Sequence, residues 1–424
     1  MKDPAAATDF SKVLPIVFGG DVGAYTLGLE SYQAFGVGSV CIAHQPVDLI
    51  TRSRIFDVVS IGPQASDEER LKTLRKVADA NPGRDYLLLT NNDGLVGFLT
   101  RHRDTLGPEF VMPFPDAKIV RLLSSKTQFA EVCERAGAPT PPSLVVDLAE
   151  GAEGTWSPPS VPFRFPLVGK PDSTDEYEKV SFPGKEKVYY LDNQEQLDRL
   201  WSDLRGAGYQ GTFLVQELIP GTDWDKRTVT MYVDSNGRTT MRAAGQVLLE
   251  DPTPTMIGNP SAMITRDMPK LWKQGEAILQ ELGYRGFANF DLIVDPRDGV
   301  AYFFELNPRA GRSSYFVVAG GVNPVEVAAR DLILGQKLRP VQATRRALYT
   351  LLPVPLILHY VTDKKLKKEV RELVRERRVV NPLRAKVEGD LKRRLVVELQ
   401  GLNFYRKFAK HYRRSVVETK PGRS

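Results

Sequence analysis

The first 120 residues alternate short runs of β-branched and aromatic residues with amphipathic segments, and this alternation constrains the fold more than any other feature of the chain. The runs with strand character are Val13–Phe18, Ser39–Ala43, Asp57–Ile61 and Tyr86–Thr90. The segments with helical periodicity are Thr26–Phe35, Asp67–Ala80 and Gly94–His102. Strands that alternate with helices form a parallel sheet that the helices cover. We therefore predict a small parallel-sheet α/β domain at the start of the chain.

The rest of the chain is organised differently. Three helices are predicted there: one from Ser124 that Gly137 ends, one over Gln194–Leu204 and one over Pro269–Leu282. Two strands are also predicted, one ending at Lys170 and one over Phe213–Leu218. The Pro-, Gly- and Ser-rich segment Gly151–Phe165 is predicted to be a loop. Residues 228–305 favour antiparallel strands around the last of these helices. This half of the chain is therefore expected to be α+β.

Composition excludes several classes of protein. The 424 residues are 42% hydrophobic, which suits packed globular units, and no run of 18 apolar residues is present. The polar segment Met1–Phe10 lacks the order of a signal peptide, so we expect a cytoplasmic protein. Two cysteines, Cys41 and Cys133, and four scattered histidines provide no disulfide framework and no zinc-ligand spacing.

Positive charge is concentrated at the end of the chain. Residues 341–424 contain 22 Lys and Arg against 8 Asp and Glu, whereas residues 1–340 contain 36 against 44. The main body is therefore acidic, and we expect no nucleic-acid partner for it.

The segment around Asp291 and Glu305 is the strongest candidate for chemistry. Two apolar strands, joined by the turn Pro296–Gly299, form a predicted hairpin on which Glu305 and Asn307 share a face. Asp291 lies on the partner strand and can join them. Two carboxylates and an amide oxygen on an apolar sheet suit Mg²⁺, while a solvent-exposed hairpin with ordinary polar residues is the alternative.

Two further elements have the residue types that a nucleotide needs. Lys126 begins a helix and Lys170 ends a strand, and two converging lysines would supply positive charge for phosphates. The strand around Gln216 runs into a Pro-Gly turn followed by Asp223 and Asp225, as adenine and ribose contacts would require. Solvated surface lysines and a plain strand edge are the alternatives.

At this point the chain resembles the ATP-grasp superfamily, and within it the D-aspartate ligases of Gram-positive peptidoglycan synthesis. The segments that carry the resemblance are Leu14–Asp21, Leu249–Asn259, Gly286–Asp291 and Glu305–Ser314, with Val380–Leu383 and Lys392–Arg394 in the tail.

The resemblance implies an α/β (α+β ATP-grasp) fold with four parts. A Rossmann-like domain over residues 1–120 would precede two ATP-grasp lobes, 121–212 with a lid and 213–340 with the metal site, which hold ATP between them. A basic, mostly helical extension over residues 341–424 would follow.

The resemblance also implies roles for individual residues. Contacts with the phosphates of ATP are expected from Lys126 and Lys170. The expected adenine and ribose contacts are Gln216, Glu217 and Ile219 for the base, with Asp223 or Asp225 for the sugar. Mg²⁺, as two ions that Mn²⁺ can replace, would be held by Asp291, Glu305 and Asn307.

Two arginines follow the metal-binding strand. We assign Arg309 and Arg312 as catalytic residues for the transferred phosphoryl group and a substrate carboxylate, because a guanidinium makes paired hydrogen bonds to such anions. Some ATP-grasp ligases have an arginine two positions before the first metal ligand, where this chain has Asn289. Neutralisation of charge would then come from Arg309, Arg312 or Arg242.

The function implied is an ATP-dependent carboxylate–amine ligase that forms an acyl phosphate and then an amide. The expected substrates are D-aspartate, activated at its β-carboxyl, and the lysine side chain of the UDP-linked pentapeptide peptidoglycan precursor. The alternatives are a ligase for another amino acid and a nucleotide sensor without activity. A dehydrogenase ranks last because no G-x-G-x-x-G pattern is present.

Three segments have open or secondary roles. The polar stretch Pro171–Gly184 is the expected lid, because an acyl phosphate must be kept from water. The loops Gly19–Asp21 and Asn91–Asp93 are either substrate-binding loops or structural turns. The basic tail either packs on the catalytic body, which we favour, or contacts an anionic membrane surface at the inner face of the membrane.

Overall fold

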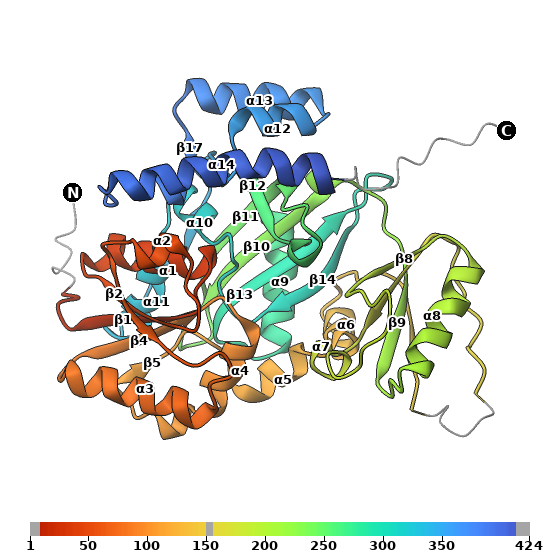
Figure 1. The fold of residues 1–424 in the computed structure, drawn as a ribbon, viewed down its shortest axis with the longest axis horizontal. Helices are drawn as coiled ribbons and strands as arrows, with labels where there is room; N and C mark the ends of the chain where they lie inside the picture. The colour runs from red at the N-terminus through yellow and green to blue at the C-terminus, as the bar shows by residue number, and fades with distance from the viewer. Residues whose placement is uncertain (1–8, 150–155, 413–424) are drawn as a thin grey trace.

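The computed structural model describes residues 9–149 and 156–412, which form three sheets and a helical C-terminal region (Figure 1). The first sheet is parallel and has the strand order β3-β2-β1-β4-β5. Its strands are β1 (Val13–Phe18), β2 (Ser39–Ala43), β3 (Phe56–Ser60), β4 (Asp85–Thr90) and β5 (Phe110–Val111). The helices with it are α1 (Val22–Phe35), α2 (Asp48–Thr51), α3 (Asp67–Ala80), α4 (Asp93–Arg101) and α5 (Ala117–Leu123). The predicted parallel sheet is therefore confirmed.

Alternation along the strands places apolar residues on both faces of this sheet. Ile16 and Leu88 pack with α3 and α4, whereas Val17 and Leu89 pack with α1. Residues two apart share a face of a strand, so a strand buried on both sides must be apolar throughout. This explains why the strands appear in the sequence as continuous apolar runs.

The second sheet is antiparallel and has the order β6-β9-β7-β8. It comprises β6 (Ser143–Asp147), β7 (Leu167–Pro171), β8 (Tyr189–Leu191) and β9 (Thr212–Glu217), with helices α6 (Lys126–Arg135), α7 (Thr174–Tyr177) and α8 (Gln194–Gly206) in the same part of the chain. The predicted loop Gly151–Phe165 lies outside the described residues as far as residue 155, and its described part, 156–165, contains no helix or strand.

The third sheet is the largest and has the order β14-β13-β10-β11-β12-β16-β17, with β15 paired to β11. Its strands are β10 (Lys226–Val233), β11 (Thr239–Glu250), β12 (Pro260–Arg266), β13 (Gly286–Val294), β14 (Ala301–Asn307), β15 (Val341–Ala343), β16 (Leu348–Thr350) and β17 (Val379–Val380). Helix α9 (Pro269–Glu281) covers the face that includes Met231, and α10 (Tyr315–Ala319) and α11 (Pro324–Leu332) cover the face that includes Tyr232. We propose that the three sheets are the cores of the predicted units 1–120, 121–212 and 213–340.

The C-terminal region is mainly helical, as predicted, but it also extends the third sheet. Its helices are α12 (Val354–Tyr360), α13 (Lys364–Arg375) and α14 (Leu391–His411). Over the whole described chain there are also four short 3₁₀ turns: Arg103–Thr105, Asp223–Asp225, Pro254–Met256 and Pro382–Arg384. Strand β16 pairs with β12, and β17 pairs with β16. Ile357 and Val361 are fully buried, so the predicted packing of this region on the body is confirmed.

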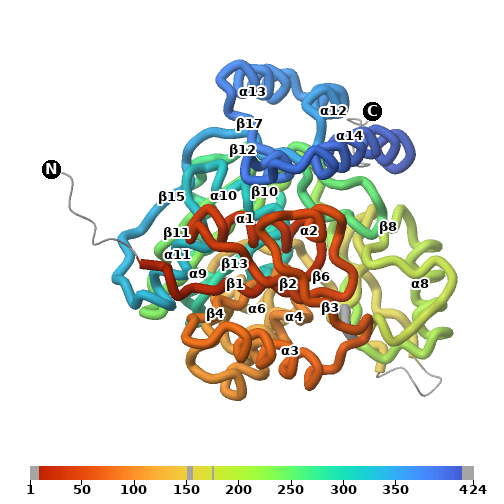
Figure 2. Tube along the Cα trace, turned by 60° about the vertical axis from the view of Figure 1, so that its left-hand side comes forward, coloured from red at the N-terminus to blue at the C-terminus, as the bar shows by residue number. Residues whose placement is uncertain are grey.

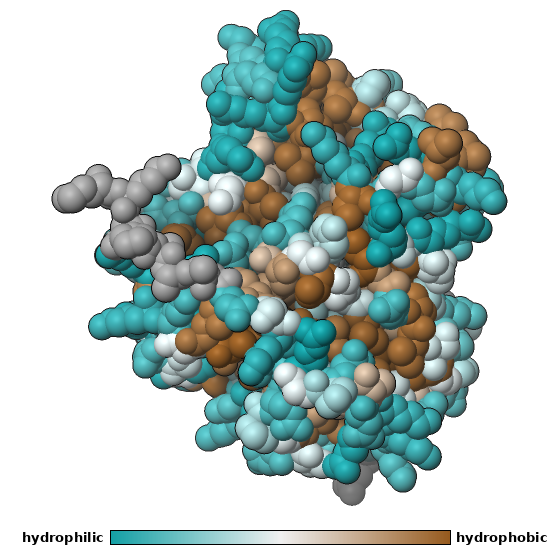
Figure 3. Space-filling model, turned by 90° about the vertical axis from the view of Figure 1, so that its left-hand side faces the viewer, coloured by the Kyte–Doolittle hydropathy of each residue, from teal (hydrophilic) through white to brown (hydrophobic). Residues whose placement is uncertain are grey.

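Helix α14 runs between the pair α12–α13 and the helices α1 and α2 of the first domain (Figures 1 and 2). The projection at the top of Figure 3, which contains α13, is largely hydrophilic on the face shown, with hydrophobic residues beside and below it. No described helix is long and apolar enough to cross a membrane.

A buried arginine joins α14 to the first domain. Arg393 is 1% exposed; its guanidinium lies 4.8 Å from the centre of the Tyr25 ring and donates to the Leu383 carbonyl at 3.1 Å. Glu388 lies 3.6 Å from Arg393 and accepts a hydrogen bond from Ser53 at 2.5 Å. A buried charge is tolerated only when it is paired, so this contact fixes the tail on the first domain.

We predict that Arg393→Ala destabilises the protein by about 3–5 kcal/mol, because it leaves the Glu388 carboxylate buried without its partner. Arg394→Ala is the matched control, since the neighbouring Arg394 is exposed. Urea unfolding followed by circular dichroism measures both variants. Equal unfolding midpoints for the two variants would show that the buried pair does not hold the tail.

Candidate active site

Two carboxylates lie opposite each other on the β13–β14 hairpin. The strand register pairs Asp291 with Glu305, and the Asn307 amide nitrogen lies 3.0 Å from Asp291 and 3.4 Å from Glu305. Thr228 on β10 also donates to Asp291, at 3.2 Å. Burial, and next the charge of Glu305, raise the pKa of Asp291 well above its usual range. The hairpin therefore concentrates negative charge that a cation would stabilise.

This arrangement fits a divalent cation with oxygen ligands. The Asn307 oxygen accepts from Arg309 at 3.2 Å, and rotation of the amide would exchange its nitrogen for that oxygen at the carboxylates. In the described part of the chain no group of three His, Cys, Asp or Glu is placed to hold a metal. Two carboxylates and the Asn307 amide oxygen would suit Mg²⁺, and their role as metal ligands stays a prediction.

Lys126 and Lys170 converge on the same place from the second sheet and α6. Lys126 donates to the Asp172 carbonyl at 2.9 Å, and Lys170 lies 5.9 Å from the centre of the Phe304 ring on β14. Burial lowers the pKa of both lysines, that of Lys170 to about 8, and the charge of Lys126 lowers the pKa of Lys170 further. The negative charge of Glu305 opposes this shift and raises the pKa of both lysines. The negative groups near the two lysines therefore do not fully offset the cost of burying their positive charge. A bound polyphosphate would supply the missing negative charge.

Asp172 positions the start of α6, although the sequence did not single it out. Its carboxylate accepts from the Ser125 hydroxyl at 2.7 Å and from the Thr127 backbone N–H at 2.7 Å. Carboxylates stabilise the N-terminus of a helix by satisfying its free N–H groups. Asp172 thereby ties the end of β7 to the helix that begins at Lys126.

The predicted adenine-binding residues lie at the end of β9, where the second sheet leads into the third. Gln216 is buried and donates to Ser143 at 2.6 Å, and the Glu217 N–H donates to the Pro142 carbonyl at 2.9 Å. Ile219 is also buried, 6% exposed. Their contact with adenine stays a prediction.

The two aspartates after this strand have different environments. Asp225 accepts from the backbone N–H and the hydroxyl of Thr222, both at 2.8 Å, so its carboxylate closes its own turn. Asp223 is buried, accepts from the Glu250 N–H at 3.2 Å and lies 3.5 Å from Lys226. Both carboxylates therefore have partners within the protein, and a ribose contact for either stays a prediction.

Lys226 and Glu250 complete a charged cluster that the sequence did not reveal. Lys226 donates to Glu250 at 2.7 Å, and Glu250 also accepts from the Gly258 N–H at 3.2 Å. Burial opposes the charge on Lys226, but Glu250 and Asp223 together raise its pKa. Glu250 also contributes to the raised pKa of Asp291, so the cluster borders the carboxylate pair.

The two arginines contact the loops of the first domain. Arg309 makes a two-point ion pair with Asp93, at 2.9 and 3.0 Å, and Arg312 donates to Asp21 at 2.9 Å. Asn91 donates to the same Asp21 carboxylate at 3.2 and 3.3 Å. The loops Gly19–Asp21 and Asn91–Asp93 therefore lie at the site and hold its arginines.

The same loops are also structural turns. Asp21 caps α1 by accepting from the Ala24 N–H at 2.9 Å, and Asn92 caps α4 through the Leu95 N–H at 3.0 Å. Gly23 is required by close approach, since a Cβ there would lie 2.1 Å from the Asn91 amide nitrogen. The loops are therefore structural turns that also hold the two arginines, and their contact with substrate stays a prediction.

Comparison with known proteins identifies the family. A family model described as the ATP binding domain of the carbamoyl-phosphate synthase L chain matches residues 235–340. The chain is 30% identical over 409 residues to a D-aspartate ligase of Enterococcus faecium (strain Aus0004), and the match covers 94% of this chain and 96% of that protein. The chain belongs to the D-aspartate ligase family. It is thus a member of the ATP-grasp carboxylate–amine ligases.

Solved structures share the fold of this ligase. An L-amino acid ligase from Bacillus licheniformis superposes with a TM-score of 0.53 at 15% identity, covering 77% of this chain and 75% of that one. The biotin carboxylase domain of the Hydrogenobacter thermophilus 2-oxoglutarate carboxylase, solved with MgADP, ADP and bicarbonate, gives 0.56 at 15% identity, covering 79% and 72%. These similarities confirm the predicted ATP-grasp fold.

Arg242 and Asn289 bear on how the ligase neutralises charge without an arginine two positions before Asp291. Arg242 is paired with Glu276 on α9, so it is committed to a helix contact. Asn289, at the position where some relatives have arginine, is buried and accepts from Thr230 at 2.8 Å. A Cβ at Gly311 would lie 2.8 Å from the Asn289 oxygen. All three predicted arginines thus have a carboxylate partner, and which of them neutralises the transferred charge stays a prediction.

The predicted lid of the ligase begins beside Lys170 and packs on the second sheet. Tyr177 on α7 is 2% exposed, and its hydroxyl lies 2.5 Å from that of Tyr189. Lys185 donates to the Tyr177 and Val180 carbonyls at 2.9 and 2.6 Å. The segment thus has its own anchors next to the lysines, and its function as a lid stays a prediction.

We predict that ATP binding weakens above about pH 8. The pKa of Lys170 is lowered to about 8, so its positive charge is lost as the pH rises through that value. The dissociation constant of MgATP, measured by calorimetry from pH 6.5 to 9.5, should rise at the upper end. Lys170→Arg should remove this rise, because a guanidinium stays charged.

At pH 7, Lys170→Met should weaken binding by about 10- to 100-fold, as expected for losing a hydrogen bond from a charged group. Lys72→Met is the control, because Lys72 is exposed on α3, away from the proposed ATP contacts. A pH-independent affinity in the wild-type protein would contradict a phosphate contact for Lys170.

Proposed function

We propose that this ligase activates the β-carboxyl of D-aspartate with ATP and joins it to the lysine side-chain amine of the UDP-linked pentapeptide peptidoglycan precursor. The observation that carries the proposal is the 30% identity to a D-aspartate ligase over nearly the whole of both chains. The proposal places the reaction in the cytoplasm, where ATP and a nucleotide-linked acceptor are available.

In this proposal ATP lies between the second and third sheets. Lys126 and Lys170 bind its phosphates, the chain from Gln216 to Ile219 borders the adenine, and Asp223 binds the ribose. Asp291, Glu305 and Asn307 hold Mg²⁺, as two ions that Mn²⁺ can replace. When bound, the metal neutralises charge on the phosphate oxygens during transfer.

Arg309 and Arg312 act on the two anions that react. Arg309 binds the γ-phosphoryl group in transfer, and Arg312 binds a carboxylate of the amino acid. Ion pairs with Asp93 and Asp21 hold both guanidinium groups in place before substrate arrives. Preorganised cations lower the barrier because they need not reorient as charge develops. The acyl phosphate then reacts with the amine, and ADP and phosphate are released.

We predict that the purified ligase releases ADP with D-aspartate and a lysine-containing UDP-MurNAc-pentapeptide, and that the product is heavier by one aspartyl residue. The test combines a coupled ADP assay over a panel of D- and L-amino acids with mass spectrometry of the products. Asp291→Asn is the matched negative control, because it removes one metal-binding carboxylate without changing size.

The outcomes of this assay separate the alternatives. Turnover with a different amino acid would contradict the D-aspartate assignment and leave the ligase reaction in place. ADP release in no combination, together with intact ATP binding, would instead support a nucleotide sensor.

A further inference from the structure

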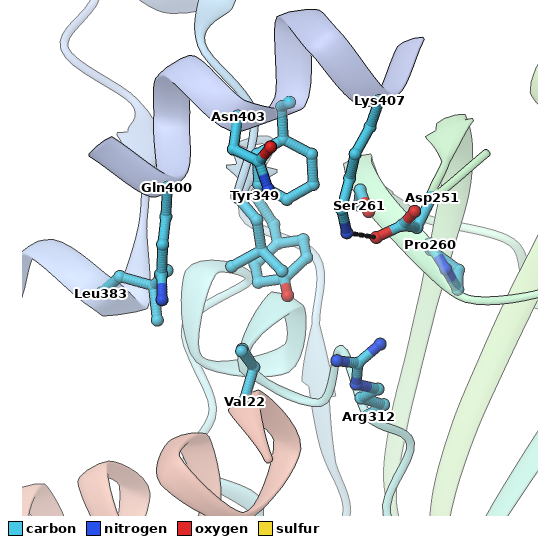
Figure 4. A pocket seen from close by; sticks show the side chains of 12 residues that line it. Val22, Asp251, Pro260, Ser261, Arg312, Tyr349, Leu383, Gln400, Asn403 and Lys407 are labelled. Carbon is cyan, nitrogen blue, oxygen red and sulfur yellow. Dashed lines mark hydrogen bonds and ion pairs between the residues drawn. The ribbon is translucent and has the colours of Figure 1, made fainter. Parts of the chain in front are cut away.

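A pocket of about 200 Å³ lies between the C-terminal helix α14 and the loop that contains Arg312 (Figure 4). Its walls come from parts of the chain that are far apart in the sequence: the start of α1, the ends of β11 and β12, strand β16 and one face of α14. Arg312 links the pocket to the proposed reaction. Two residues separate it from Arg309 along the chain, so the two Cα atoms are within about 11 Å of each other.

Tyr349 places an unpaired hydroxyl in this pocket. The residue is 0% exposed, and its hydroxyl has no hydrogen-bond partner among the described residues. In Figure 4 the hydroxyl points away from α14, toward the side where Arg312 and Val22 lie. Buried polar groups are nearly always hydrogen-bonded, so an orphan hydroxyl at a cavity wall indicates a missing partner.

The charged groups of the pocket form a specific set. Arg312 donates from its Nε to Asp21, and its Nη1 lies 3.8 Å from Met256 Sδ, which is a weak acceptor. Lys407 on α14 points into the pocket and donates to Asp251 at 3.0 Å. The pocket thus offers two cations, one carboxylate and one phenol hydroxyl.

We propose that this pocket binds the amino-acid substrate, and that α14 contributes to its recognition. The proposal rests on the proposed function, because it identifies where that reaction takes its acid. An amino acid with two carboxylates and one ammonium complements the two cations and one carboxylate of the pocket. The carboxylates bind at Arg312 and Lys407, the ammonium binds at Asp251, and Tyr349 donates its hydroxyl to a carboxylate.

Tyr349→Phe tests this assignment with little risk to the fold, because the hydroxyl has no hydrogen-bond partner in the described part of the chain. We expect the variant to raise the KM for the amino acid about tenfold and to leave the KM for ATP unchanged. Lys407→Gln should act in the same direction. Lys368→Gln, a substitution at an exposed position on α13, should change neither constant.

Direct binding separates failure of this assignment from failure of the proposed function. Calorimetry with D-aspartate and a non-hydrolysable ATP analogue needs no turnover. Weaker binding to Tyr349→Phe than to the wild-type protein supports the pocket even if no acceptor reacts. Equal binding to both overturns the pocket, and the proposed function then stands or falls on the ADP assay alone.

The opposite face of α14 carries an independent feature. Five large apolar residues are exposed along it: Leu391 (76%), Leu395 (60%), Leu399 (55%), Leu402 (64%) and Tyr405 (41%). Spacings of three and four residues put them in one stripe on the helix. The buried residues Val397 and Phe408 lie on the other side of the same helix.

Basic residues border this stripe. Lys392, Arg394, Arg406 and Lys410 are all exposed on α14. Glu398 is the only acid within the helix and is paired with Arg384 at 2.9 Å. A second copy of α14 packed on the stripe would bring these cations close to one another. An anionic surface complements them instead.

We propose that the outer face of α14 binds an anionic lipid surface. The leucines would enter the boundary between headgroups and acyl chains while the basic residues contact the headgroups. This orientation leaves the pocket on the inner face of α14 beside the catalytic loop.

Co-sedimentation of the full-length protein with vesicles tests this surface. We expect binding to vesicles with 30% phosphatidylglycerol at 50 mM salt, at least tenfold weaker binding at 500 mM salt, and weak binding to pure phosphatidylcholine. The double variant Leu395→Ser/Leu402→Ser should lose binding, whereas Val374→Ser, at an exposed apolar position on α13, should retain it. Absence of binding at low salt, or a dimer in solution that the double variant dissociates, would overturn the proposal.

Discussion

The repulsion between Asp291 and Glu305 is the constraint on which the rest of the site depends. Strand pairing sets these two carboxylates opposite each other on a largely apolar hairpin, and burial together with the charge of Glu305 makes the charge of Asp291 costly. Positive groups approach from the surrounding elements: two lysines from the second sheet and α6, and two arginines from the loop after β14. Lys126, Arg309 and Arg312 have carbonyl or carboxylate partners within the protein, whereas Lys170 lies near the Phe304 ring, so three of the four cations are held in place before any ligand is bound. A metal ion and a triphosphate would complete a charge balance that the protein alone leaves unfinished.

The sequence predicted the parts of this site that depend on local spacing. The period of two along a strand placed Glu305 and Asn307 on one face, and the hairpin turn brought Asp291 to them. It could not choose between Asp223 and Asp225, because both follow the same strand and only tertiary packing shows that Asp225 closes its own turn. Sequence spacing also gave no indication of Asp172, Lys226 or Glu250. Their partners lie on other elements, or at positions along the chain that no regular helix or strand spacing links to them. The motif containing Glu250 was recognised as part of the family resemblance, but nothing local indicated its role.

The contacts between the arginines and the first domain explain why the N-terminal α/β domain belongs to the catalytic unit. Asp21 and Asp93 each occupy a helix start at the carboxyl edge of a parallel sheet, where such folds commonly bind ligands. Here these carboxylates bind arginines of the third sheet's loop. Movement of the first domain would therefore move both guanidinium groups. Positioning of the arginines and docking of the domains are the same interaction.

Helix α14 has different neighbours on its two sides, and this limits how its sequence can change. Inserting or deleting one residue would rotate everything beyond that point by about 100° around the helix axis. The apolar stripe and Lys407 would then no longer face the surroundings that they face now. Substitutions within each face can accumulate one at a time, whereas changes in length alter both faces at once. Evolutionary drift in α14 should therefore preserve its number of residues more strictly than the identity of any outer leucine.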